Sequence, residues 1–278
     1  MEVTFRTAGK VLSADLRNGT SIAVDLDFKG DQPSHFGAEK ATREPMVAGG
    51  FSGRTKSGAG CNVDYLRLNP HCNGTHTETI GHIVNEPITI ADVAMGGLYL
   101  SEVVSVAAVS ADSAAGSGET YQPEFQSTDW VITKALLEEK LSNSKDATDA
   151  LIIRTLPNEA SKKSRCYGEK NQPAFLTTEA IGYIIERGCG HLLVDLPSVD
   201  RLYDDRLMNN HHVFWNVPSG THQLSDSSWR EKTITEMIFV PDTIADGLYM
   251  LSLQVPAFIC DAAPSRPILY PVREVNND

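Results

Sequence analysis

The sequence has no long apolar run, which excludes the simplest membrane architecture. A membrane-spanning helix needs roughly 20 consecutive apolar residues, and no stretch of this chain approaches that length. The first residues, Met1 to Arg6, contain no basic segment followed by an apolar stretch, so we expect no signal peptide. These absences lead us to expect a soluble protein of the cytoplasm.

Cysteine and positive charge are also scarce. The 5 cysteines are an odd number without regular spacing, so they do not form a disulfide framework, and they fit a reducing compartment. The chain has 24 Lys and Arg against 36 Asp and Glu, which gives a formal net charge of −12. Nucleic acid and anionic lipid both require clustered Lys and Arg, so we expect neither nucleic acid nor a membrane as a partner.

The chain lacks internal repeats, low-complexity tracts and any change of composition that would mark a linker. With 278 residues and an apolar fraction of 41%, it is predicted to form one α/β domain over residues 1–278, with a mixed sheet and few helices. A strand at 150–156, a helix at 177–187 and a strand at 192–196 predict a parallel β-α-β crossover. The other predicted segments are strands at 3–5, 21–28, 46–51, 62–69, 98–109, 233–240, 247–255 and 266–272, helices at 133–141 and 204–215, and a loop at 110–126.

Chemically reactive side chains are concentrated between His71 and His82. This segment holds three imidazoles, one thiol and one carboxylate, which are groups that bind transition metals or move protons near neutral pH. His76 and Glu78 are two residues apart, so in an extended chain they would share a face and could reach one ion. Gly74 would let the backbone turn tightly before them. The segment therefore predicts a reaction centre built around metal.

The pattern Cys-x-Gly-Thr-His-x-Glu-x-x-x-His resembles a signature of the metal-dependent cyclase family, which includes bacterial kynurenine formamidase and isatin hydrolase. That signature is His-x-Gly-Thr-His-x-Asp-x-x-x-His. Two positions depart from it: Cys72 stands where the family has His, and Glu78 stands where it has Asp. His71 is one residue out of register and would replace Cys72 only if the backbone bulges.

The resemblance continues downstream in the same order. Asp195 to Asp200 is similar to the family's Asp-x-x-Ser-x-Asp turn, and the pair His211-His212 is similar to a segment whose second His is a ligand. Glu236 lies in a segment similar to the strand whose Glu completes a second metal site. The stretch 219–232 is then an insertion, which we expect to form a polar loop near the site.

The resemblance implies a swivelling β/β/α-like fold and a hydrolase with one or two divalent ions, zinc or manganese. It implies metal-bound hydroxide attacking a small amide or cyclic amide, as in the arylformamidase of tryptophan catabolism, with His82 as proton shuttle and Thr75 as a donor to the oxyanion. It also implies a homo-oligomer, either a dimer or a tetramer. The implied metal ligands are Cys72, His76 and Glu78 for the first ion, and Glu78, His212 and Glu236 for the second.

Several alternatives stay open at this point. Cys72 is either a ligand or a small buried residue, and His82 is either catalytic or a histidine that supports the ligands. A related enzyme that opens lactones or imides, and a non-enzymatic relative without metal, are the competing functions. We expect Asp195 and Asp200 to organise a turn. We expect His35, His191 and His222 to lie on the surface, because no motif contains them.

Overall fold

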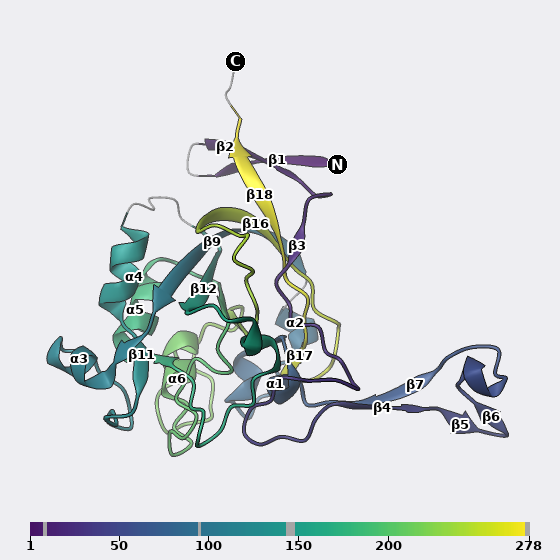
Figure 1. Cartoon of the computed structure of the whole chain (residues 1–278). Coiled ribbons are helices and arrows are strands. Elements are labelled where there is room, and N and C mark those ends of the chain that lie inside the picture. The colour runs from purple at the N-terminus through teal and green to yellow at the C-terminus, as the bar shows by residue number, and fades with distance from the viewer. Residues whose placement is uncertain (8–9, 94–95, 143–147, 276–278) are drawn as a thin grey trace.

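The structure is a computed structural model that describes residues 1–7, 10–93, 96–142 and 148–275. Its main feature is an 11-stranded mixed sheet with the strand order β1-β2-β18-β16-β9-β12-β14-β15-β8-β17, in which β3 also pairs with β18 (Figure 1). These strands are β1 (Glu2–Thr7), β2 (Lys10–Asp15), β3 (Thr20–Ser21), β8 (His76–Glu78), β9 (Gly97–Ala107), β12 (Ala150–Leu156), β14 (His191–Val194), β15 (Thr233–Glu236), β16 (Gly247–Leu253), β17 (Ala262–Pro264) and β18 (Ile268–Glu274).

The remaining elements are short. The smaller sheets contain β4 (Thr42–Pro45) with β7 (Asp64–Arg67), β5 (Val47–Ala48) with β6 (Phe51–Ser52), and β10 (Val109–Ser110), β11 (Trp130–Ile132) and β13 (Phe175–Leu176). The helices are α1 (Pro70–Asn73), α2 (Ile90–Val93), α3 (Ala111–Gly116), α4 (Lys134–Leu141), α5 (Thr178–Glu186) and α6 (Asn209–Trp215), with 3₁₀ turns at Thr55–Ser57, Ile80–His82 and Ala160–Ser164. None of the helices in the described part of the chain has the length and apolar character needed to cross a membrane.

The centre of the large sheet is parallel. Strands β9, β12, β14 and β15 run in one direction, so their carboxyl ends lie along one edge. Helix α5 connects β12 to the adjacent β14, which confirms the predicted β-α-β unit. Thr177 caps α5 by accepting a hydrogen bond from Ala180 N at 3.1 Å. Ile181 and Ile184 of α5 are fully buried, and each contributes roughly 1.5–3 kcal/mol of hydrophobic stabilisation.

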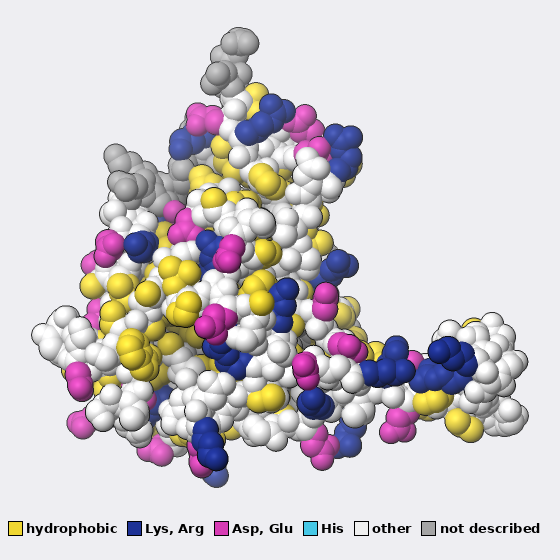
Figure 2. Space-filling model, in the orientation of Figure 1, with side chains coloured by type: hydrophobic (Ala, Val, Ile, Leu, Met, Phe, Trp, Pro, Cys, Tyr) yellow, Lys and Arg dark blue, Asp and Glu magenta, His cyan; other side chains and the backbone are white. Residues whose placement is uncertain are grey.

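A narrow arm formed by residues 42–67 projects from the body (Figure 1). Strands β4 and β7 form its stem, and β5 and β6 form a hairpin near its end. Gly49 and Gly50 both have positive φ, 54° and 83°, as a tight two-residue hairpin turn requires. Figure 2 shows Lys and Arg side chains gathered along this arm, while Tyr65 and Leu66 of β7 are exposed. The arm buries little of itself, so the core lies in the body.

Four predicted segments differ from the structure. The single strand expected at 46–51 is instead the hairpin of β5 and β6, because Gly49 and Gly50 form a turn within it. The strand expected at 21–28 ends at Ser21, because later backbone groups bond to separate elements: Ile22 O accepts from Phe239 N, and Val24 N donates to Thr75 Oγ1. The helix expected at 204–215 begins only at Asn209. The loop expected at 110–126 contains α3, whose cap, Ser110, accepts a hydrogen bond from Ser113 N.

Candidate active site

The site is built around the short strand β8, which lies between β15 and β17. His76 stands opposite Glu236 in the antiparallel register with β15, so both side chains project from the same face. Glu78 is two residues further along β8 and shares that face. His76 Nε2 lies 3.5 Å from Glu236 Oε2, and all three side chains are buried. The structure thus brings together His76, Glu78 and Glu236, as the sequence analysis expected.

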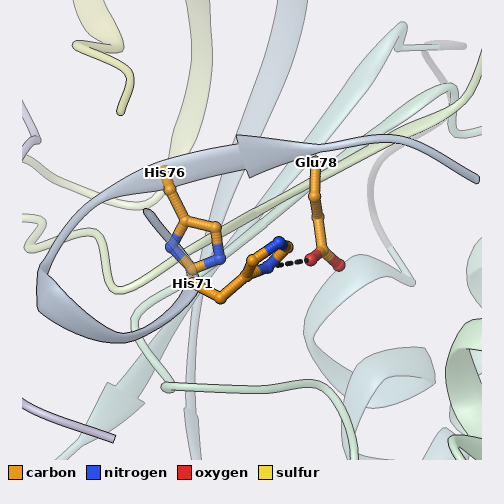
Figure 3. A group of neighbouring side chains, drawn as sticks. All are labelled: His71, His76 and Glu78. Carbon is orange, nitrogen blue, oxygen red and sulfur yellow. Dashed lines mark ion pairs between the residues drawn. The ribbon is translucent and has the colours of Figure 1, made fainter. Parts of the chain in front are cut away.

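His71 reaches the same place from helix α1. Asn69 caps the helix by accepting a hydrogen bond from His71 N, and Gly74, with φ 154°, turns the chain from α1 into β8. The His71 ring lies between two carboxylates: Nδ1 is 3.0 Å from Glu78 Oε2 (Figure 3), and Nε2 is 2.9 Å from Asp261 Oδ2. Burial lowers the pKa of His71, but these two partners outweigh it and raise the pKa to about 10.

The cluster contains His211, and the expectation that His212 would join it was wrong. His211 Nε2 lies 2.9 Å from Glu78 Oε1, and its Nδ1 lies 2.5 Å from Asp200 Oδ2. His212 Nδ1 instead donates to Val217 O at 3.2 Å. Consecutive residues of a helix point about 100° apart, so only one of the two rings can face the site. The backbone N–H groups of Asn210 and His211 donate to the Asp200 carboxylate, and these bonds set the helix orientation so that His211 faces the site.

Asp200 therefore does more than organise a turn. It holds the His211 ring through Nδ1, which leaves Nε2 directed at Glu78. Burial opposes ionisation of Asp200, yet the hydrogen bond from His211 keeps the pKa of the carboxyl below its usual range. The pKa of His211 is raised well above its usual value, because Glu78 and Asp200 outweigh the effect of burial.

His82 stands beside the cluster on the 3₁₀ turn that follows β8. Its ring stacks on His71 with centroids 4.2 Å apart, and its Nδ1 lies 3.1 Å from Asp261 Oδ2. Its Nε2 lies 3.9 Å from Glu78 Oε2. Hydrogen bonds from His71 and His82 hold the pKa of Asp261 well below its usual range. The Asp261 carboxylate, far along the chain, therefore orients the rings of His71 and His82. No sequence motif predicted this role.

Two residues expected in the site have other surroundings. Cys72 lines the cavity, and burial together with Glu236 raises the pKa of its thiol, but Cys72 is absent from the groups of described residues whose potential ligand atoms lie within 4.8 Å of one another. The Thr75 hydroxyl donates to Met237 O at 2.5 Å and accepts from Val24 N at 2.9 Å. Because both bonds go to backbone groups, the Thr75 hydroxyl links the segments that contain Val24 and Met237 and is not free to stabilise an oxyanion.

The inserted stretch 219–232 lies against the segment that follows His82. His222 Nδ1 donates to Ile83 O at 2.9 Å, and Asn85 N donates to His222 O at 2.8 Å. The insertion therefore packs close to the site. His222 is exposed, as expected, and His191 is half-buried. His35 is buried and lines the cavity, so its expected surface position was wrong.

The cavity beside these residues has a volume of about 350 Å³ and an acidic wall. Its carboxylates are Glu78, Asp200, Asp204 and Glu236. The guanidinium of Arg201, which also lines it, is occupied by Asp129 and by Glu124 O, both at 3.0 Å. Among the described residues that line the cavity, the groups left to balance the negative charge are imidazoles.

The donor atoms of the cluster fit a divalent metal. His76 Nδ1 donates to Gly74 O at 3.0 Å, so its Nε2 carries a lone pair. Within the described ranges, His76 Nε2 and Glu78 Oε2 are buried atoms without a hydrogen-bond partner, and the His71 ring, although close to Glu78, is not aligned for one. A buried unsatisfied polar atom costs roughly 1–3 kcal/mol. A cation between these lone pairs would remove that cost, and imidazole and carboxylate suit zinc and manganese.

Comparison with known proteins identifies the family of the chain. A family model described as "Putative cyclase" matches residues 12–201, which include the whole segment from His71 to His82. The chain belongs to the cyclase family. The family match ends before His211 and Glu236. A comparison with curated protein sequences gives no match.

Solved structures of similar proteins cover the rest of the chain. A structure described as a predicted metal-dependent hydrolase from Bacillus stearothermophilus has a TM-score of 0.58 and 13% identity, over 91% of this chain and 97% of the other. Isatin hydrolase A from Labrenzia aggregata has a TM-score of 0.61 and 14% identity, over 91% and 93%. Isatin hydrolase A from Ralstonia solanacearum has a TM-score of 0.60 and 13% identity, over 91% of each chain. At these identities the likeness establishes the cyclase fold, a single α/β domain with a large mixed sheet.

Proposed function

We propose that this cyclase-family protein is a metal-dependent hydrolase that cleaves the C–N bond of a small amide or cyclic amide. The observation that carries the proposal is the pair of buried atoms His76 Nε2 and Glu78 Oε2 beside an acidic cavity. Neither has an aligned hydrogen bond among the described residues, although His71 Nδ1 lies 3.0 Å from Glu78 Oε2. A structural protein would gain nothing from keeping such atoms unsatisfied.

Two neighbouring sets of side chains would hold the metal. His71, His76 and Glu78 would form the first site, with His71 in the place that the sequence analysis gave to Cys72. Glu78, His211 and Glu236 would form the second, and Glu78 would be shared between them. A bound divalent cation supplies a water of lowered pKa, near ~7, and polarises a substrate carbonyl.

His82 is positioned to move the proton. Asp261 holds its Nδ1–H, so Nε2 faces the cavity as an acceptor. It would take a proton from the attacking water and give it to the leaving nitrogen, so that water adds across the C–N bond and yields a carboxylic acid and an amine. Asp261 would keep the ring in this orientation, as carboxylates beside catalytic histidines do.

The size of the cavity limits the substrate. A volume of about 350 Å³ lies at the lower end of the range for small-molecule sites and is far too small for a folded protein or a long peptide. A compound of one or two rings fits this space. This supports a small amide or cyclic amide, and it leaves arylformamidase activity as one member of the proposed class.

Opening of a lactone or imide is the second candidate function. The same groups would serve it, because both reactions add water to a carbonyl carbon. The insertion at 219–232, packed against residues 83–86, favours a specificity of its own, since loops carry specificity on a shared scaffold. The support for a non-enzymatic relative was Cys72, and His71 now supplies an imidazole close to that corner of the site.

Metal analysis followed by a substrate panel tests the proposal. We expect the purified protein to contain zinc or manganese and to hydrolyse at least one compound among N-formylkynurenine, isatin and simple lactones. Activity should disappear with chelator and return when metal is added. A protein that stays metal-free after incubation with both ions, and is inactive on the whole panel, would refute it.

A further inference from the structure

His35 is a buried histidine in the wall of the cavity that the proposed metal sites do not use. His35 is only 4% exposed, and it lines the same cavity as His71 and Glu236. It is absent from the groups of His, Cys, Asp and Glu, searched over the described ranges, whose ligand atoms lie within 4.8 Å of one another. His35 is therefore close to the site without belonging to either set of ligands.

The His35 ring has an unused hydrogen-bonding atom. Its Nδ1 is buried and finds no partner in the described part of the chain. A buried ring nitrogen without a partner is unfavourable, and in native structures it calls for a reason. His76 and Glu78 have such a reason in the proposed cation. Because His35 lines the same cavity, a bound substrate is the partner that its ring nitrogen could reach.

The backbone of His35 is held in place from several sides although it lies outside regular structure. His35 N donates to Cys72 O at 3.2 Å, which fastens it to the helix that carries His71. The buried Gln32 side chain donates to Ala41 O at 3.1 Å and accepts from Ala41 N at 2.9 Å, and this closes the loop. Ser34 N donates to Arg165 O at 3.1 Å. These hydrogen bonds together fix the position of His35 beside the cavity.

Aromatic rings lie next to His35 on the outer side. Phe36 packs edge-on against the His35 ring, with centroids 4.6 Å apart, yet it is 58% exposed and has φ 53°, an unfavourable angle for a bulky residue. Tyr203, 45% exposed, lies 6.3 Å from Phe36. Backbone strain such as that at Phe36 is concentrated at functional sites, and the exposed Phe36 ring lines the cavity, where it could stack on a flat ligand.

The His35 ring differs from its neighbours in charge. Burial and the nearby His76 lower the pKa of His35 to about 4, so the ring is neutral at physiological pH. A neutral imidazole offers one donor and one acceptor, whereas the carboxylates of the cavity only accept. An amide group likewise has one acceptor, its carbonyl oxygen, and one donor, its N–H. The two groups are complementary whichever tautomer His35 adopts.

We propose that His35 binds the substrate directly, with Nδ1 in a hydrogen bond to the amide group being cleaved and Phe36 covering the ring of a flat substrate. This inference rests on the proposed function and adds to it a residue that binds the substrate. His35 is a substrate-binding residue in this proposal, and it does not hold metal.

Variants of His35 test the inference on the panel substrate that the protein hydrolyses best. His35→Leu removes the hydrogen bond, and His35→Asn keeps a polar atom near the position of Nδ1. We expect KM to rise about 10- to 100-fold in H35L with kcat changed less than about threefold, and KM in H35N to return to within about fivefold of the parent. The control is His191→Leu, which removes a half-buried imidazole outside the cavity and should leave KM unchanged.

Metal content and direct binding of the reaction product, measured by calorimetry, complete the test. H35L should keep its metal and its melting temperature and bind the product about tenfold or more weakly. Unchanged KM and product affinity in H35L would overturn the inference while the proposed function stands. Loss of metal from H35L in proportion to its loss of activity would also overturn the inference, because His35 would then act on metal binding. A parent protein inactive on the whole panel would overturn the proposed function and this inference with it.

Discussion

Two buried polar clusters lie at the carboxyl ends of the parallel strands, and they differ in how completely their atoms are satisfied. In the first, Asp195, just beyond β14, accepts from Lys162 Nζ at 2.8 Å and from Thr155 N and Oγ1 at 2.9 Å each. Lys162 Nζ also donates to Thr155 O. In the second, His76 Nε2 and Glu78 Oε2 are buried and make no aligned hydrogen bond with any described residue. The first cluster is satisfied by its own atoms, whereas the second leaves two buried atoms for the proposed metal.

The charges of the two clusters support the same distinction. Asp195 and Lys162 form a one-to-one buried pair. The site gathers Glu78, Glu236 and Asp200 around imidazoles whose own charge depends on those carboxylates. Burial of ions without compensation is expensive, so an excess of buried negative charge indicates a cation, while a balanced pair indicates structure. Substitutions in the two clusters should therefore have different effects.

Removal of a shared ligand should have the largest effect. Glu78→Gln takes away the carboxylate common to both proposed metal sites. Loss of the metal removes several kcal/mol of transition-state stabilisation, so we expect kcat/KM to fall about 1,000-fold. Bound metal, measured by elemental analysis, should fall in parallel. Glu39→Gln, at an exposed carboxylate paired with Arg67, is the control. Full metal content and activity in E78Q would remove the distinction between the clusters.

The balanced cluster should respond in stability and not in chemistry. Lys162→Met leaves Asp195 buried without its partner and should lower the free energy of unfolding by about 3–5 kcal/mol, measured by denaturant titration. Metal content of the folded protein should not change. Lys170→Met, at an exposed lysine, should have no effect. The double variant Lys162→Met/Asp195→Leu should recover most of the loss, and a failure to do so would mean that the pair is not isolated.

The neighbouring histidines His211 and His212 provide a matched pair of variants. His211→Ala should reduce kcat/KM by at least about 100-fold, because it removes an imidazole that lies 2.9 Å from Glu78. His212→Ala should change it less than about threefold, since that ring bonds to Val217 O. Steady-state kinetics and metal analysis of both variants decide the matter, and the reverse order of effects would show that the orientation of α6 is wrong.

Loss of the carboxylate that orients two rings should have a moderate effect. Asp261→Asn removes the negative acceptor of His71 and His82 but keeps the size of the side chain. We expect kcat to fall about 10- to 100-fold, as for other groups that orient ligands or catalytic histidines, with at least part of the metal retained. An unchanged kcat would exclude His82 as the group that moves the proton in the proposed manner.

The smallest effect is expected at Cys72. Cys72→Ala removes the thiol while His71 stays in place, so metal content and kcat/KM should change less than about threefold. His71→Ala should reduce bound metal strongly by comparison. If C72A loses metal and H71A keeps it, the first proposed site has Cys72 as its ligand, as the sequence analysis originally expected.

The sequence allowed prediction of those parts of the site that depend on local geometry. His76 and Glu78 share a face because strand side chains alternate, and Glu236 could be placed through its resemblance to a family strand. The choice between His71 and Cys72 depended on the turn at Gly74, and the choice between His211 and His212 depended on the helix orientation set by Asp200. Both choices depend on contacts between residues that no short sequence pattern encodes.

Other participants had no signal in the sequence at all. Asp261 meets His82 across 179 positions of the chain, and His35 becomes buried only because Gln32 and Cys72 fix its loop. The overall sheet was predictable in its central β-α-β unit, where apolar runs mark buried strands. It was not predictable at 21–28, where an alternating apolar pattern belongs to a segment that bonds to several elements in turn.

Strand β8 is bonded along both edges, to β15 on one side and β17 on the other. A shift of one residue would turn Thr77 toward the cavity and bury His76 and Glu78 on the far side, where Thr77 now meets Thr235 and Ser265. Pairing on both edges therefore fixes the register of β8 and with it the positions of His76 and Glu78. In the proposed hydrolase, a change of substrate would therefore fall to the loops in front of β8, while the positions of the reactive groups stay the same.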